Sequence, residues 1–465
     1  MTSTSVLEKG EEKQAVDEKR GEERIKKAGY PGNLVVAALG ASLGSFSFGY
    51  NMGSLNVVST VLTECAGSQG AWGCVKVTEA QSGYIASFLC LGALIGCLSG
   101  GKIIDRLGRR GLILWNNVSF VMGLGLMVGS THWTMLMIGR LLVGVGVGVS
   151  CVAVPMYLTE VSSWDVRGVI GSLHQLMIVV GYLLALLFGL TLKNTFYMWR
   201  IIIGADLLVC GVQVLMGMVG LVRESPKHSM LKDDQQAAED TLKWLRGPAY
   251  DEREQRELGT TQVVKPLGLI TLVRTRLPEV YKSLLIVALL HLAQQLSGVN
   301  AIFYFSSQIF ANSVYVPIGI AVLNVVMTVV SLALMDRAGR RPLLLLSTGG
   351  MILAYILFTV AEHGSMATLK ATSVLFYIAS FALGMGPVPW LMLGEIFSPW
   401  SVSAGVTLGV GVNWVSNFLV VAIFQPQLNL LGRNVMLPYL VVLVVVFLWA
   451  ALCLPETKGR PAALL

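Results

Sequence analysis

The sequence predicts an all-α membrane protein whose twelve transmembrane helices form two pseudo-symmetric bundles of six. Three observations support this fold class: charge is scarce, apolar segments of membrane-spanning length recur, and a set of short motifs appears twice. Only 13% of the 465 residues are charged, against roughly 25% in an average soluble domain. So few charges cannot cover a water-exposed surface, which excludes a soluble protein of several domains.

The charges are also concentrated in two segments. Residues 1–29 hold 14 of the 61 charges and residues 223–282 hold 21, which leaves 26 for the other 376 residues. Apolar stretches of about 20 residues, the length of a helix that crosses a bilayer, recur through this remainder. The expected spans are 34–62, 80–101, 111–130, 133–158, 168–192, 199–222, 280–310, 314–335, 342–361, 371–396, 403–425 and 433–454.

The basic residues predict the orientation in the membrane. With the N-terminus inside, short cytoplasmic segments carry ten Lys or Arg and the opposite loops carry four, which fits the usual excess of positive charge in the cytoplasm. Both termini are then cytoplasmic, and the net charge of +7 reflects this asymmetry and not binding to nucleic acid. The expected parts are a cytoplasmic tail (1–33), a six-helix bundle (34–222), an intracellular helical linker (223–279), a second bundle (280–454) and a second cytoplasmic tail (455–465).

An internal repeat relates the two halves. The segment Asp105–Arg110 (DRLGRR) returns as Asp336–Arg341 (DRAGRR), 231 residues later. Arg223–Pro226, after the sixth span, is echoed by Pro455–Arg460 after the twelfth. Two such halves around a site at the membrane midplane are the architecture of an alternating-access transporter.

At this level of detail the sequence resembles the sugar porters of the major facilitator superfamily, and most closely the facilitative hexose transporters. The resemblance covers residues 34–460 and implies the major facilitator fold. Ten motifs carry it, in the expected order: Phe48–Asn51, Asp105–Arg110, Gly139–Arg140, Pro155–Tyr157 with Glu160, Arg167–Gly168, Gln294–Asn300, Asp336–Arg341, Gly386–Trp390 with Glu395, Asn413–Asn417 and Pro455–Arg460.

A cluster of neutral amides marks the candidate substrate site. Gln294, Gln295 and Asn300 fall within about one and a half turns of span seven. An amide donates and accepts, as a sugar hydroxyl does, so such a cluster suits an uncharged sugar. The alternative is that the amides bond to one another and hold helices together. The resemblance adds Gln175, Asn324, Trp390 and Asn417, with Phe303, Tyr304 and Phe381 as apolar faces for the sugar ring.

Arginines and carboxylates at the inner ends of the spans form a second candidate site. The resemblance implies a cytoplasmic latch of Arg–carboxylate pairs that holds the outward-open state; the alternative is anchoring to lipid headgroups. The expected members are Arg106, Arg109, Arg110, Glu160 and Arg167 in the first half, and Asp336, Arg337, Arg340, Arg341 and Glu395 in the second. Val402 stands where the repeat would place a counterpart of Arg167, so we expect a weaker latch in the second half.

Energy coupling depends on the acids within the spans. Proton-coupled members of the resembled family carry Asp in span one, where this chain has Asn51, and an amide does not exchange a proton in the physiological range. Asp206 is the remaining acid, and we expect it to pair with Arg140 and stay charged. The sequence therefore predicts a facilitative uniporter. A proton-coupled symporter that uses Asp206 is the alternative.

The expected substrate is D-glucose, with fructose, galactose, mannose or inositol left open by the neutral site and by His291 and Ala382. The alternative from another class is a sensor that binds sugar without carrying it. We expect no enzymatic activity, no cofactor and no metal. ATP is not expected either, because Gly96–Lys102 lacks the Ser or Thr of a phosphate-binding loop. A monomer in the plasma membrane is expected. Cys65 and Cys74 share an outer loop and could form a disulfide or remain free.

Overall fold

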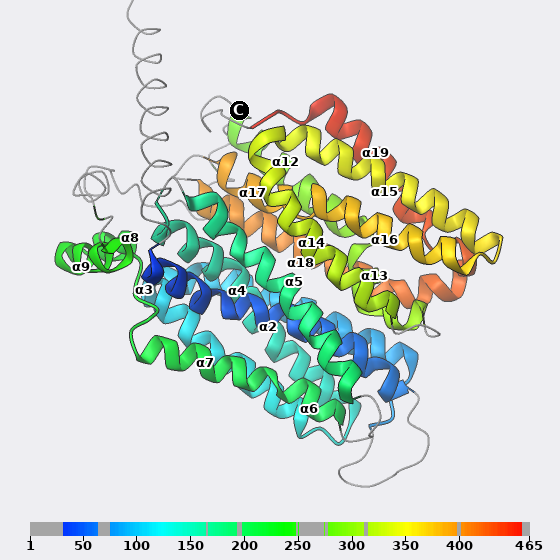
Figure 1. Cartoon of the computed structure of the whole chain (residues 1–465), viewed down its shortest axis with the longest axis horizontal. Coiled ribbons are helices and arrows are strands. Elements are labelled where there is room, and N and C mark those ends of the chain that lie inside the picture. The colour runs from blue at the N-terminus through cyan, green and yellow to red at the C-terminus, as the bar shows by residue number, and fades with distance from the viewer. Residues whose placement is uncertain are drawn as a thin grey trace, which may run out of the picture.

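The computed structural model describes residues 31–63, 75–163, 166–192, 198–247, 250, 274, 278–310, 315–397 and 401–457. These residues are almost wholly helical (Figure 1). Within them, nine helical segments are long and apolar enough to cross a membrane, and two shorter apolar helices cover Tyr315–Ser331 and Leu437–Cys453. One of the nine contains two of the expected spans, so the twelve-span fold class is confirmed.

The first half runs from α2 to α7. Its helices are α2 (Gly32–Thr63), α3 (Glu79–Val128), α4 (Trp133–Val161), α5 (Arg167–Leu192), α6 (Met198–Gly204) and α7 (Asp206–Met218). Helix α3 holds spans two and three and turns sharply at Gly108, whose φ of 81° is readily adopted only by glycine. Helices α6 and α7 together make span six.

The second half runs from α12 to α19. Its elements are α12 (Pro278–Leu296), α13 (Val299–Ile309), α14 (Tyr315–Ala338), α15 (Arg340–His363), α16 (Ala367–Leu383), α17 (Val388–Glu395), α18 (Val402–Leu431), the 3₁₀ turn η3 (Gly432–Asn434) and α19 (Leu437–Cys453). Spans seven and ten are each made of two helices, broken at Gly298 and before Pro387. Such interruptions are typical of spans that line a transport site.

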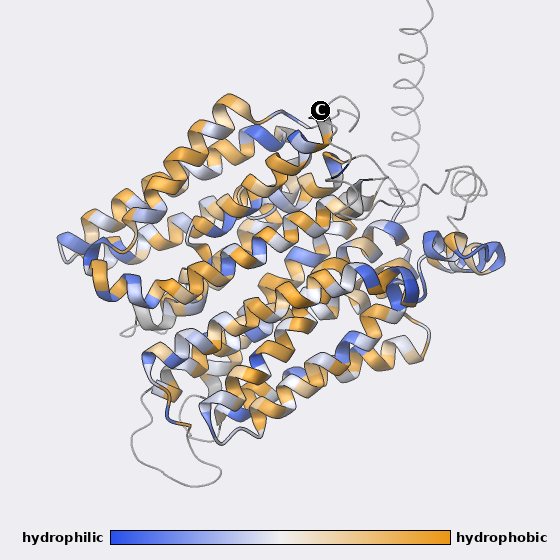
Figure 2. Ribbon diagram, turned by 180° about the vertical axis from the view of Figure 1, so that it is seen from behind, coloured by the Kyte–Doolittle hydropathy of each residue, from blue (hydrophilic) through white to orange (hydrophobic). Residues whose placement is uncertain are grey.

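The two halves lie side by side, with α2–α7 below and α12–α19 above in Figure 1. They meet where α18 packs on α3, α14 on α5 and α13 on α2. Apolar residues run along the long helices, and polar residues gather at their ends and on α9 (Figure 2). This distribution fits helices that face lipid along their length and water at both ends.

Two short helices follow the first half: α8 (Pro226–Leu231) and α9 (Gln235–Arg246). The apolar face of α9 buries Leu242 and Leu245. Arg246 at its end donates to Val161 O at 2.8 Å, and Asn33 donates to Trp244 O at 2.9 Å. These bonds attach α9 to the ends of α4 and α2. Residues 251–273 of the expected linker and the cysteines Cys65 and Cys74 lie outside the described residues.

Glycines bring α3 and α4 into backbone contact. A Cβ at Gly92 would lie 2.0 Å from Leu141 O, and one at Gly144 would lie 2.2 Å from Leu89 O. Small residues at this spacing let membrane helices approach closely, and van der Waals packing then holds them without a hydrophobic drive.

Replacing Gly92 by Ala is therefore expected to destabilise the purified protein by about 1–3 kcal/mol, because the added methyl group overpacks the contact. Gly125→Ala is the matched control: it lies on the same helix, and a Cβ there meets no atom within 4 Å. The midpoint of thermal unfolding in detergent measures the difference. Equal midpoints for the two variants would contradict the packing described here.

Candidate functional site

A cavity lies between the two halves and takes side chains from both. It contains about 680 Å³ of empty space, the part open to solvent included. Its lining comprises Phe48, Met52, Gln175, Ile178, Val179, Tyr182, Gln294, Gln295, Val299, Asn300, Phe303, Asn324, Phe381, Gly386, Trp390, Asn413, Trp414 and Asn417. None of these carries a charge at pH 7.

Nine of the ten residues predicted to contact a sugar line this cavity. Tyr304, the tenth, does not line the cavity: it is 1% exposed and lies near Cys90 and Arg140. The cause is helix geometry, because neighbouring positions on a helix are turned by about 100° from each other. Phe303 therefore faces the cavity while Tyr304 faces the first half.

Asn413 of α18 joins the amides of span seven. Its Nδ2 donates to Gln294 Oε1 at 2.7 Å, and its Oδ1 accepts from Gln295 Nε2 at 3.0 Å. Asn300 Nδ2 then donates to Gln295 Oε1 at 2.5 Å. Sequence analysis missed Asn413, although its spacing of four residues from Asn417 places both on one helix face. That spacing was the available signal.

The rest of the lining includes a buried acceptor without a partner in the described part of the chain, and several aromatic faces. Asn417 Oδ1 is buried and has no hydrogen-bond partner among the described residues. Phe48 and Trp414 have ring centroids 5.5 Å apart, and Tyr182 and Phe303 are 5.2 Å apart. A buried acceptor beside aromatic rings suits a ligand with hydroxyl donors and an apolar face.

Hydrogen bonds join the two halves at the end away from α8 and α9. Asn56 Nδ2 on α2 donates to Phe303 O at 2.6 Å and to Ser306 Oγ at 2.7 Å on α13. Tyr182 OH donates to Phe303 O at 2.9 Å, and Gln425 Nε2 on α18 lies 3.3 Å from Glu79 Oε2 on α3. The halves are therefore held together at this end.

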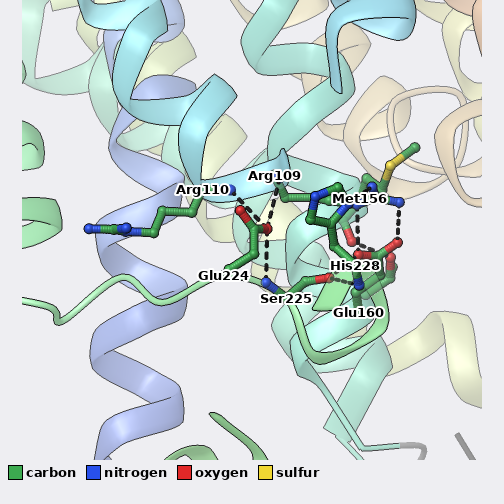
Figure 3. Close-up of polar contacts among 8 residues, drawn as sticks. Arg109, Arg110, Met156, Glu160, Glu224, Ser225 and His228 are labelled. Carbon is green, nitrogen blue, oxygen red and sulfur yellow. Dashed lines mark hydrogen bonds and ion pairs between the residues drawn. The ribbon is translucent and has the colours of Figure 1, made fainter. Parts of the chain in front are cut away.

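At the opposite end, arginines pair with carboxylates inside the first half (Figure 3). Arg109 contacts Glu160 through Nε–Oε2 at 2.8 Å and Nη2–Oε1 at 2.9 Å, and Ser225 Oγ also donates to Glu160. Glu224 Oε1 accepts from the backbone N–H of Arg109 at 2.8 Å. Burial lowers the pKa of His228, which keeps the ring neutral at pH 7; its Nδ1 lies 3.0 Å from Arg109 Nη1 and accepts there.

The second half repeats this arrangement. Arg340 Nη2 lies 2.7 Å from Glu395 Oε1, and Thr457 Oγ1 donates to Glu395 Oε2 at 2.6 Å. Glu456 accepts from the backbone N–H groups of Arg340 at 2.9 Å and Arg341 at 3.1 Å. Sequence analysis did not assign Glu224 or its counterpart Glu456, although both lie in the repeated segments after spans six and twelve.

Glycine makes both carboxylate contacts possible. Gly339 has a φ of 86°, like Gly108, and a Cβ there would lie 2.8 Å from Glu456 Oε2. Each carboxylate thus accepts from N–H groups at the start of a helical segment, where negative charge is stabilised.

The other predicted latch residues are placed differently. Arg106 is exposed, and Arg110 Nη2 donates to Gly217 O at 2.9 Å, as Arg341 Nη2 does to Ala451 O at 2.6 Å. The side chains of Arg167, Asp336, Arg337 and Val402 lie outside what the structure describes. Both Arg–Glu pairs are within one half. Arg340 contacts both oxygens of Glu395, as Arg109 does with Glu160.

The expected ion pair between Arg140 and Asp206 is not present. Asp206 accepts instead from Ser47 Oγ at 2.8 Å and from Asn51 Nδ2 at 2.7 Å. Arg140 Nη1 donates to the backbone oxygen of Asn51 at 2.7 Å, and its Nε and Nη2 have no hydrogen-bond partner among the described residues. Asn51 stands between the two charges, so neutral groups hold the Asp206 carboxyl.

Removing the charge of Glu224 in Glu224→Gln is expected to destabilise the protein by about 1–2 kcal/mol, because a charge-assisted bond at a helix start is lost. Glu239→Gln is the matched control. It removes an exposed pair with Lys243, four residues on, for which about 0.5 kcal/mol is expected. Thermal unfolding of the purified variants compares the two. A larger loss in Glu239→Gln would contradict the role given to Glu224.

The family model described as sugar (and other) transporter matches residues 37–464. Facilitated glucose transporter member 3 of Mus musculus is 33% identical over 458 residues, which cover 92% of this chain and 91% of that protein. Member 4 of Homo sapiens is 34% identical over 463 residues, covering 92% and 89%.

Solved structures share the fold. The proton:xylose symporter XylE bound to 6-bromo-6-deoxy-D-glucose aligns with a TM-score of 0.77 at 22% identity, covering 92% of this chain and 97% of that one. The inward-open conformation of the xylose transporter XylE from E. coli gives a TM-score of 0.75 at 23% identity, covering 92% and 98%. At this identity the likeness establishes the major facilitator fold alone.

Proposed function

The chain belongs to the family of sugar and other transporters, and we propose that it carries hexoses, with D-glucose as the expected substrate, by facilitative uniport. The observation that carries this proposal is the cavity between the halves, whose lining combines neutral amides with aromatic rings and includes no carboxylate. The facilitated glucose transporters similar to this chain support the choice of glucose.

The lining chemistry suits reversible binding of a neutral polyol. Hydrogen bonds to sugar hydroxyls can be donated and accepted by the amides of Gln295, Asn300 and Asn417. The rings of Phe303 and Phe381 can cover the apolar face of the sugar ring. Uncharged hydrogen bonds exchange readily with water, so a sugar held by them can leave on the side to which the site opens. No covalent step is required.

The way in which the halves are joined supports alternating access. Asn56, Tyr182 and Gln425 connect them at the outer end, so we assign this conformation to the inward-facing side of the cycle. The Arg109–Glu160 and Arg340–Glu395 pairs stiffen the inner end of each half. Each half can then move as a unit about the central cavity, breaking the outer bonds as the inner ends approach.

The arrangement around Asp206 favours uniport over proton coupling. Asp206 is fully buried and does not line the cavity; Ser47 and Asn51 occupy its oxygens. A sugar bound at Gln295 therefore has no carboxyl beside it whose protonation it could alter. We place the protein in the plasma membrane as a monomer, with both termini and the linker of residues 223–279 cytoplasmic.

Gln295→Ala is expected to lower initial uptake of labelled D-glucose into liposomes at least tenfold, because it removes a donor and an acceptor from the cavity; tenfold corresponds to about 1.4 kcal/mol. Gln235→Ala, on the exposed surface of α9, is the matched control and should transport like the wild type. Uptake by Gln295→Ala at the wild-type rate would place the sugar elsewhere. Glucose binding by the wild type without any flux would favour a sensor.

Asp206→Asn tests coupling. For a uniporter, glucose equilibrates without any change of lumenal pH, in the wild type and in Asp206→Asn alike. A pH-sensitive dye trapped in the liposomes follows protons while labelled glucose follows the sugar. Proton movement that accompanies glucose in the wild type and disappears in Asp206→Asn would establish the symporter instead.

A further inference from the structure

Two backbone carbonyl groups fix the orientation of the first of the four hydrogen-bonded amides beside the cavity. Gln294 Nε2 donates to two backbone oxygens, Met385 O at 2.9 Å and Gly386 O at 2.7 Å, in the break between α16 and α17. A carbonyl oxygen can only accept. The NH₂ group of Gln294 must therefore face the break between α16 and α17, and its Oε1 must face the other way.

This orientation passes to Asn413. Gln294 Oε1 needs a donor, which Asn413 Nδ2 supplies at 2.7 Å; its other N–H faces His291 Nδ1 at 3.1 Å. Asn413 Oδ1 is consequently turned to Gln295, whose Nε2 donates at 3.0 Å. His291 could not impose this direction alone, since a neutral histidine can carry its proton on either nitrogen.

The orientation of Gln295 in turn fixes the orientation of Asn300. Because Gln295 Nε2 is turned to Asn413, its Oε1 faces Asn300, whose Nδ2 donates at 2.5 Å. The four amide side chains are 2–8% exposed, so water does not readily replace a broken bond between them. Reversing any one amide would oppose two donors or two acceptors and leave buried polar groups unsatisfied, which is unfavourable.

We propose that Asn413 is a positioning residue for sugar specificity: it transmits the hydrogen-bond direction set at Met385 and Gly386 to Gln295 and Asn300, and so fixes which amide atoms face the substrate. This inference rests on the proposed function, in which a sugar occupies this cavity. It assigns to Asn413 a role that a residue used merely to fill space would not have.

The fixed direction makes a chemical prediction. Gln294 has no N–H left for a ligand, whereas one N–H of Gln295 and one N–H of Asn300 have no partner among the residues that the structure describes. A sugar hydroxyl that meets these groups must accept. Fluorine accepts weakly and hydrogen does not accept, so at that ring position a fluoro derivative should be carried better than a deoxy derivative.

The experiment compares matched monodeoxy and monodeoxyfluoro derivatives of D-glucose, each as an inhibitor of labelled glucose uptake into liposomes. The wild type should favour the fluoro derivative about tenfold at one ring position or more. Asn413→Leu should lose that preference, because Gln295 and Asn300 can then reverse together and present oxygen. Asn417→Leu, one turn along α18, is the matched control: it should weaken uptake but keep the preference.

A second variant covers the case in which Asn413→Leu fails to fold. Gln294→Met has nearly the same shape and separates Asn413 from the two carbonyls, so it should also lose the preference. Retention of the wild-type preference in Asn413→Leu or in Gln294→Met would overturn the inference, as would a wild type without any such preference. In both cases glucose uptake by the wild type would leave the proposed function standing. Absence of hexose uptake by the wild type would overturn both.

Discussion

The structure depends on one constraint: inside a bilayer, a polar group must find its partner within the protein, since no water is there to supply one. Gln213 illustrates it: its Oε1 accepts from Asn117 Nδ2 at 2.9 Å, and its Nε2 donates to Gly40 O of α2 at 2.9 Å. The same requirement places Ser47 and Asn51 on the Asp206 carboxyl and joins Gln294 to Gln295 through Asn413. At Asn417, whose buried Oδ1 has no hydrogen-bond partner among the described residues, this requirement is left unmet.

The two halves satisfy this constraint in the same way at the end of the molecule where α8 and α9 lie. Glu224 and Glu456 each receive backbone N–H groups beside a glycine of positive φ, and Glu160 and Glu395 each receive an arginine and a hydroxyl. Because these contacts stay inside one half, the boundary between halves is left to weaker bonds. A rigid half and a breakable boundary are what rocking about a central site requires.

Much of the fold was predictable because apolar runs of sufficient length indicate membrane-spanning helices and basic loops indicate their orientation. The amide cluster at Gln294, Gln295 and Asn300 was predictable as well, since three amides in an apolar span are costly without a reason. The Asp206 environment was not, because a sequence does not show that Asn51 lies between Asp206 and Arg140. The position of Tyr304 outside the cavity lining was not predictable either, since motif membership does not fix which helix face a residue occupies.

The proposed transport requires that the amide-lined cavity opens to each side of the membrane in turn and carries hexose across. Counterflow tests it most directly: liposomes loaded with unlabelled D-glucose and an uncoupler are diluted into a trace of labelled glucose. A carrier whose site alternates should give a transient accumulation of label above its equilibrium level, because unlabelled sugar inside then competes with label for the outward step. Label that rises to equilibrium without an overshoot, or does not enter, would contradict it.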